Sequence, residues 1–366
     1  MTVQIDPILD DEESATSSGL STLYCWQDSA TMEVSTQVDI VVATKSKERM
    51  TILIPKKSRT IRVDPDCPPK IGFLGFEDIK DDTTMKQLGG ITLSFFYILL
   101  PFIRPKEMAQ PAYYRTLDAP NRLLLFLMKM KLGLNFGAIG CFFKVSKTSA
   151  SKIFHNVLET LYEKTKTWIF WPSREAVKET MPSAFTNYPQ CRAIIDCTEL
   201  PSDTPPTVEQ RVQMYSSYKS GFTVRFLIGI SPSGMITSIS KAYGGRPTDG
   251  FIVNHSGFIA LVEPDDEIMA YKGFPQIKTA LLERQYVLVI PPFATNPQFT
   301  VEEVREAYSI ASVRIHVERA IQRVKIFGIL RHISIELLNY IDKVMYVACV
   351  LGNNKEPLIR IEDESS

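Results

Sequence analysis

The fold is decided by the stretch Arg192-Ala193-Ile194-Ile195-Asp196-Cys197, an apolar run that ends in a carboxylate. Short apolar runs bounded by turn residues are typical of buried β-strands. Two β-prone segments follow, Thr223–Ile230 and Met235–Ala242, on either side of the turn sequence Ser231–Gly234. We therefore predict a strand that ends at Asp196, followed by a β-hairpin.

The chain after this hairpin alternates between helical and strand patterns. The expected elements are a helix over Thr248–Leu261, strands over Glu267–Ala270 and Tyr286–Ile290, and a mostly helical segment over Thr300–Leu330. Such an order predicts an α/β domain, with helices on the faces of a mixed, five-stranded sheet. We place this domain at residues 190–352, followed by a C-terminal tail at 353–366.

Residues 79–180 predict an all-α domain, because their apolar residues recur at three-to-four spacing. Within it, Phe136–Phe143 predicts a short helix, 144–146 a turn, and Thr148–Lys166 a second helix capped by Ser146. A helix, a short turn and a helix are the outline of a helix-turn-helix, here at about 121–173.

The helix-turn-helix segment is basic. Residues 121–178 contain ten Lys or Arg and three Glu, a local charge of about +7. Polar and basic side chains crowd the start of the second helix, where such motifs contact DNA. The residues that we predict to bind DNA are Lys144, Lys147, Thr148, Ser149, Ser151 and Lys152. The alternative is a plain helical bundle with a solvated basic face.

Residues 1–78 predict a weakly ordered arm that is acidic at its start and rich in Ser and Thr. A basic string between Lys45 and Arg62 suits either nuclear import or DNA contact, or an ordinary solvated surface. The whole chain carries 41 basic and 41 acidic residues, so the zero net charge is a cancellation between parts.

The remaining composition predicts a soluble, intracellular protein. The six cysteines are scattered without a C-x-x-C pair, which favours reduced thiols and no zinc site. Residues 1–7 do not resemble a signal peptide, and the longest apolar run, Ile91–Ile103, is too short to span a bilayer. We expect no membrane association.

Two acids are candidates for chemistry. Asp196 lies at the carboxyl end of the first predicted strand, where ligands bind in open α/β sheets, although it could instead cap the following turn. Glu318 shares a helical face with Arg314, Gln322 and Lys325. It could be a metal ligand flanked by cations, or one partner in a surface i,i+4 ion pair.

Seven segments, in this order and with compatible spacing, resemble the DDE superfamily endonuclease domain of Harbinger-type transposases. They are Ile194–Glu199 (IIDCTE), Gln213–Lys219 (QMYSSYK), Leu227–Gly234 (LIGISPSG), Tyr243–Asp249 (YGGRPTD), Lys272–Phe274 (KGF), Pro291–Phe293 (PPF) and Arg314–Ala320 (RIHVERA). The preceding residues 123–173 resemble the helix-turn-helix of that family, so that the resemblance covers about residues 120–355.

This resemblance implies an RNase H-like fold, in which three acids hold two divalent ions, Mg²⁺ or Mn²⁺, that cleave and join DNA strands. Asp196 matches the first acid and Glu318 the third, which makes both the expected metal ligands and catalytic residues. It further implies a nuclear location, DNA as substrate and a separate DNA-binding partner protein. A homo-oligomer stays open.

The second acid of the family pattern is replaced by Tyr271. A neutral phenol is a poor ligand for a hard divalent cation, so the replacement argues against a complete metal site. Asp249 is the candidate substitute, because it follows the third strand and would lie at the same rim of the sheet as Asp196. Two hypotheses follow: a metal-dependent DNA endonuclease or transposase, and a domesticated transposase that binds DNA without cutting it.

Four further cations could contact DNA phosphates, although a solvated surface accounts for each equally well. They are Arg246, Lys272, Arg319 and Lys325.

Overall fold

The computed structural model describes residues 72–103, 117–271, 287–292 and 300–359, and the backbone of short strands between residues 21 and 62. The chain divides into two compact units, Met1–Gly72 and Phe73–Ser366. In the first unit, β1 (Ser21–Tyr24), β2 (Thr31–Gln37) and β5 (Arg59–Arg62) form an antiparallel sheet, and β3 (Val41–Val42) pairs with β4 (Met50–Thr51). The predicted acidic start of the arm and most of the basic string lie outside the described residues.

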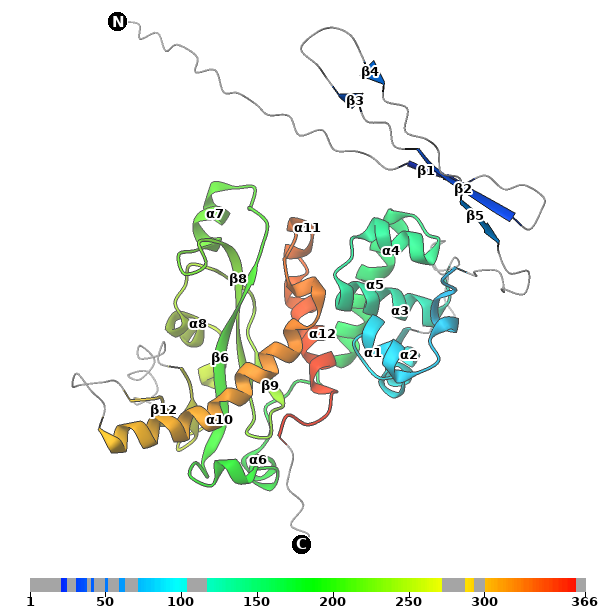
Figure 1. Ribbon diagram of the computed structural model, residues 1–366. Helices are drawn as coiled ribbons and strands as arrows, with labels where there is room; N and C mark the ends of the chain where they lie inside the picture. Colours follow the sequence, from blue (N-terminus) through cyan, green and yellow to red (C-terminus); the bar gives the residue numbers. More distant parts are fainter. Residues whose placement is uncertain are drawn as a thin grey trace, which may run out of the picture. The chain divides into compact units, whose positions relative to one another are not determined.

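The second unit begins with a helical region (Figure 1). Its helices are α1 (Asp82–Leu88), α2 (Leu93–Ile103), α3 (Ala119–Leu132), α4 (Phe136–Phe143), α5 (Lys147–Thr165) and α6 (Arg174–Glu179). The helices α4 and α5 agree with the predicted pair to within one residue. The hydroxyl of Ser146 accepts a hydrogen bond from the backbone N–H of Ser149 at 3.1 Å, which confirms the predicted N-cap.

The sheet of the second unit is mixed. Its five main strands are β6 (Cys191–Pro201), β8 (Gly221–Ile230), β9 (Ile236–Ile239), β11 (Glu267–Met269) and β12 (Val287–Val289). They are arranged in the order β9-β8-β6-β11-β12, in which β11 runs parallel to both neighbours and β8 antiparallel to both of its own. Two short strands, β7 (Tyr215–Ser216) and β10 (Tyr243–Gly244), add to β8.

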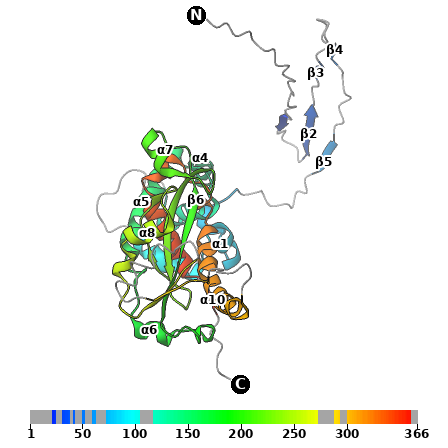
Figure 2. The same ribbon diagram turned by 90° about the vertical axis from the view of Figure 1, so that its left-hand side faces the viewer.

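Helices cover both faces of this sheet, as Figure 2 shows for α8 and α10. The helices of this part of the chain are α7 (Val208–Met214), α8 (Asp249–His255), α10 (Val301–Lys325), α11 (Ile335–Leu338) and α12 (Ile341–Asn353). Because strand side chains alternate, Ile194 joins the buried cluster that contains Val317 of α10, whereas Ile195 joins the one that contains Ile252 of α8. We call these two sides the α10 face and the α8 face.

The helical region and the α10 face of the sheet share one core. The same cluster of buried residues includes Phe126 and Phe154 from the helices, Phe226 from β8 and Val347 from α12. The hydroxyl of Tyr346 on α12 also donates to the backbone carbonyl of Thr165 at 2.9 Å. The regions expected at 79–180 and 190–352 are therefore packed together.

Two predicted helices are shorter than the sequence suggested. The helix expected over Thr248–Leu261 ends at His255, because Gly257 adopts a left-handed conformation (φ 81°) before a 3₁₀ turn at Phe258–Ala260. The long helix ends at Lys325, and Gly328 then lies against the backbone of Leu132, where a Cβ would meet atoms at 2.8–2.9 Å.

Among the described residues, no single helix is long and apolar enough to cross a membrane. The helices α1 and α2, which are bent relative to each other, reach that length and apolar content only when they are taken together.

Candidate active site

Asp196 lies in the middle of β6 and not at its carboxyl end, because the strand continues to Pro201 through its pairing with β8; the predicted strand end at Asp196 is wrong. The alternation of the strand directs Asp196 to the α10 face. Its carboxylate accepts a hydrogen bond from the backbone N–H of Cys197 at 2.9 Å. Burial raises the pKa of Asp196 to about 6. The carboxylates of Asp249 and Glu318 also raise this pKa, whereas the N–H of Cys197 and the charge of Arg314 lower it. The group is thus a partly buried acid within electrostatic reach of two others.

Glu318 lies on the exposed side of α10 and forms an ion pair one turn back along the helix. The guanidinium of Arg314 is 3.0 Å from its carboxylate. The same guanidinium lies over the ring of Tyr271, 4.7 Å from the ring centroid. The i,i+4 ion pair left open by the sequence is therefore present, and Arg314 connects Glu318 to Tyr271, the position at which the family resemblance leads us to expect the second acid.

Asp249 has different partners. It occupies the first turn of α8, and its carboxylate forms an ion pair with Arg225 of β8. A side-chain hydrogen bond with Asp249 also contributes to the raised pKa of Cys197, after the larger effect of burial. Cys197 packs against the cluster on the α8 face, so Asp249 contacts the side of the sheet opposite to Asp196. Its role as a substitute ligand stays a prediction.

The residues that are present do not fit a pair of divalent cations. Across the part of the chain that the structure describes, no three His, Cys, Asp or Glu side chains are grouped so that they could hold a metal ion. Two of the carboxylates, Asp249 and Glu318, are instead neutralised by arginines of the protein itself. Arg225 was missed by the sequence reasoning, because its position on β8 has no local signal that it would face an acid from α8.

The predicted phosphate-binding cations lie in different environments. Burial lowers the pKa of Lys325, and Lys219 lowers it further, whereas Asp196 and Glu199 oppose that shift. Lys325 is therefore within electrostatic reach of Asp196 and Glu199. Arg319 is exposed on α10, and Arg246 is exposed in the loop before α8. Lys272 lies outside the described residues.

The start of α5 presents the predicted DNA-binding residues to solvent. Lys144, Lys147, Thr148 and Lys152 are exposed, whereas Ser149 and Ser151 are half-buried. Lys144 ends α4 in a left-handed conformation (φ 53°), which turns the chain sharply between the two helices. A Cβ on Gly140 would lie 2.5 Å from the carbonyl oxygen of Val145, so this close turn requires glycine.

Three of the ten cations counted in this segment are bound to groups of the protein itself. Arg122 is buried and donates to the backbone carbonyl of Ile103 at 3.3 Å. Lys129 is buried and donates to the carbonyl of Leu134 at 2.7 Å. Arg174 is 2.9 Å from the buried carboxylate of Asp266. The basic surface is thus smaller than the local charge count implied.

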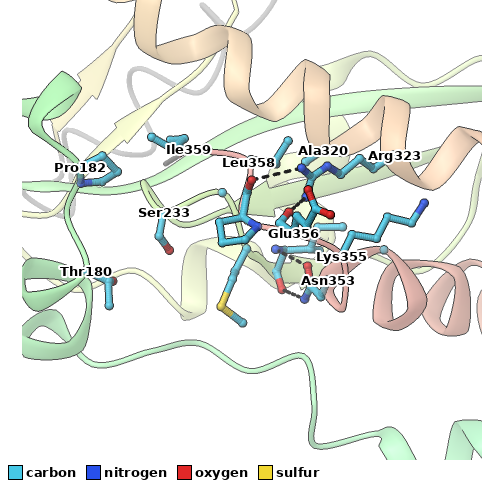
Figure 3. Close-up of a pocket in the computed structure, with 15 residues that line it drawn as sticks. Thr180, Pro182, Ser233, Ala320, Arg323, Asn353, Lys355, Glu356, Leu358 and Ile359 are labelled. Atoms are coloured by element: carbon cyan, nitrogen blue, oxygen red, sulfur yellow. Dashed lines mark hydrogen bonds between the residues drawn. The ribbon is translucent and has the colours of Figure 1, made fainter. Parts of the chain in front are cut away.

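A cavity of about 270 Å³ lies away from these residues, between the C-terminal segment, α10 and the turn before β9 (Figure 3). Its wall includes Arg323, which donates to the backbone carbonyls of Glu356 and Pro357 and so holds the C-terminal segment in place. None of the predicted site residues lines it. We assign it to the packing of this segment and not to an active site.

Comparison with known proteins gives a class that agrees with the sheet and the helix pair. Residues 195–353 match the DDE superfamily endonuclease, and residues 115–167 match the helix-turn-helix of DDE superfamily endonuclease. The chain therefore contains a DDE superfamily endonuclease domain, of RNase H-like fold, preceded by the helix-turn-helix of that superfamily. The resemblance seen in the sequence motifs is confirmed.

The chain is also similar to Protein ALP1-like of Arabidopsis thaliana, with 21% identity over 213 residues. The match covers 57% of this chain and 52% of the relative, so the chain spans about half the length of that protein. No solved structure matches the chain.

Proposed function

We propose that this protein is a transposase-derived DNA-binding protein that does not cleave DNA. The observation that carries the proposal is the combination of an intact helix-turn-helix with an acid site that does not fit divalent ions. The exposed start of α5 supports DNA binding, because the first turn of the second helix of such motifs enters the major groove. Lys144, Lys147 and Lys152 would contribute contacts to phosphates.

The loss of cleavage follows from Tyr271. Phosphodiester cleavage by two divalent ions needs carboxylate oxygens that both ions can share. In this chain the position of the second acid holds a phenol that is half exposed and covered by the guanidinium of Arg314. The proposed function therefore uses the endonuclease domain as a scaffold and not as a catalyst.

DNA binding can be tested with a 30-base-pair duplex of arbitrary sequence and fluorescence anisotropy over a range of salt concentrations. Lys147→Ala should weaken binding and reduce the salt slope by about 0.9, the value for one phosphate contact. Lys178→Ala is the matched control, because Lys178 is also exposed and basic but belongs to α6. Equal effects of the two substitutions would contradict recognition by α5.

Cleavage is tested by incubating the wild-type protein and Tyr271→Asp with duplex DNA and Mn²⁺. We expect no nicks from the wild-type protein. Nicks made by the wild-type protein and absent with Asp196→Asn would contradict the proposal and favour the second candidate, a metal-dependent endonuclease. That candidate has one observation in its favour, since Asp196 and Glu318 remain within electrostatic reach of each other.

The proposal includes a nuclear location, because the DNA that such a protein would bind is chromosomal. A separate DNA-binding partner protein and a homo-oligomer belong to the same proposal. Size-exclusion chromatography with light scattering, with and without DNA, would measure the oligomeric state.

A further inference from the structure

An open groove of about 430 Å³ is lined by residues of α7, of the segment that follows it, of the beginning of β8 and of the loop before α8. Its lining residues are Val208, Arg211, Val212, Tyr215, Ser217, Phe222 and Arg246. The helix α7 lies at one end of the sheet (Figure 1). The sequence pattern predicts no element between Cys197 and Thr223, where α7 lies.

The walls of this groove are apolar and exposed. The helix α7 has no buried residue, and the exposed fractions of Val208 and Val212 are 67% and 49%. The lining also includes aromatic rings, because Tyr215 and Phe222 lie edge to face with centroids 5.8 Å apart. Aliphatic side chains together with aromatic rings suit a flat, hydrophobic ligand.

The charge around the groove selects an anionic ligand. Arg211 is held by the protein, since its Nε donates to the backbone carbonyl of Pro205 at 2.7 Å. Arg246 is exposed, and among the described residues its guanidinium has no ion-pair partner. The lining residues include no carboxylate. A ligand with a flat ring and a phosphate would match both features of the site.

The groove lies along β8 from Asp196. In the register of β6 and β8, Pro201 is opposite Thr223 and Asp196 is opposite Ile228. The beginning of β8 is thus about five residues, or about 17 Å, along the strand from the position opposite Asp196. Lys219, two residues after Ser217 of the groove, lowers the pKa of Lys325, although burial has the larger effect, and Asp196 opposes the shift. A cation next to the groove is therefore within electrostatic reach of Lys325 on α10.

We propose that this groove binds one unpaired base of DNA, with Tyr215 stacking on the base and Arg246 pairing with its phosphate. Stacking on aromatic rings next to cations is how proteins hold single-stranded nucleic acid without reading its sequence. The proposal rests on the proposed DNA binding, but it assigns to the endonuclease domain a contact that the helix-turn-helix does not supply. An acidic, apolar protein segment is the other ligand class that such a groove could take.

The experiment compares a blunt 20-base-pair duplex with the same duplex carrying a four-thymine 3′ overhang, by fluorescence anisotropy at fixed salt. The wild-type protein should bind the overhang duplex about ten-fold more tightly than the blunt one. Tyr215→Ala should remove this preference and leave the affinity for blunt duplex unchanged, whereas Tyr215→Phe should keep it. Arg246→Gln should also remove the preference. Replacing one thymine with 2-aminopurine should give fluorescence quenching that Tyr215→Ala abolishes.

Two controls separate the groove from other effects. Tyr308→Ala removes a tyrosine of α10 that is even more exposed than Tyr215 (78% against 45%), and it should leave the preference unchanged. Lys147→Ala should weaken the binding of both duplexes by the same factor. A failure of the helix-turn-helix proposal is therefore seen independently of the ratio of the affinities for overhang and blunt duplex. If Tyr215→Ala does not fold, Val212→Glu places a carboxylate in the groove from an exposed position and should remove the preference by repelling the phosphate.

A wild-type protein without preference for the overhang would overturn the proposal. So would a preference that survives both Arg246→Gln and Val212→Glu. Either result would exclude a nucleotide from the groove, and an acidic, apolar peptide would then be the ligand to test.

Discussion

Asp266 is a buried carboxylate between two arginines, and it fixes the beginning of β11 to the strand β6 and the helix α6. Its carboxylate is 2.9 Å from Nε of Arg174 and 3.4 Å from Nε of Arg192, and its exposed fraction is 3%. Glu263 approaches the same arginines from solvent. Asp266 and Glu263 therefore pair with the same two arginines, but Asp266 is buried and Glu263 is exposed.

Asp266→Ala should lower the free energy of unfolding by about 3–5 kcal/mol, because it leaves the buried Arg192 with only the exposed Glu263, 4.0 Å away. Glu263→Ala is the matched control and should cost less than about 1 kcal/mol, since that side chain is mostly exposed. Urea denaturation of both variants measures the difference. Similar losses in the two variants would show that burial does not decide the strength of these pairs.

Asp196 should make the stability of the protein depend on pH. Burial raises its pKa in the folded protein to about 6, from an ordinary value of 3.8, so the folded state holds this proton more tightly than the unfolded state. The stability that the proton provides is present below about pH 4 and is lost as the pH rises to about 6. Asp196→Asn should therefore gain up to about 3 kcal/mol relative to the wild-type protein between pH 4 and pH 7.

The measurement is urea denaturation of both proteins at several pH values in that interval. A constant difference between variant and wild type across the interval would contradict the raised pKa of Asp196.

At the scale of elements, the helix-turn-helix and α10 were predictable because their signals are local. Ser146 precedes an amphipathic pattern and caps α5, and in α10 the buried residues Val313, Val317, Ile321 and Val324 recur at the three-to-four spacing of one helical face. The helix after Thr248 was predicted too long, because its end depends on the conformation of Gly257. The helix α7 was not predicted, since its apolar residues are exposed and signal no core.

Ser146→Ala should lower the free energy of unfolding by about 1 kcal/mol, because one N–H at the start of α5 loses its acceptor. Ser146→Gly is the comparison, and it should cost only a few tenths of a kcal/mol. Chemical denaturation followed by circular dichroism measures both. Equal stability of Ser146→Ala and the wild-type protein would contradict a role for this cap.

At the scale of the whole molecule, the helical region and the sheet are one packed body. The helix α12 lies against α5, where the rings of Tyr162 and Tyr346 are 5.3 Å apart and the hydroxyl of Tyr346 donates to Thr165. DNA bound at α5 would therefore be held in a fixed geometry relative to β6 and the groove at α7.

Tyr346→Phe removes the donor to Thr165 and should lower the stability of both regions together, by about 1 kcal/mol. Hydrogen exchange measures this, because amides of α5 and of β8 should lose protection by the same free energy. Lower protection in α5 alone would show that the two regions unfold separately.

The sequence by itself determined the order of helices and strands, the helix-turn-helix and the endonuclease domain, because periodicity, capping and ordered motifs are properties of neighbouring residues. It also identified Tyr271 as the departure from the family pattern. Only the tertiary structure decided that Arg314 covers Tyr271, that Asp249 pairs with Arg225, and that Arg122 and Lys129 are buried. These facts depend on which residues from distant segments meet across a sheet or within a core, and no local pattern encodes that meeting.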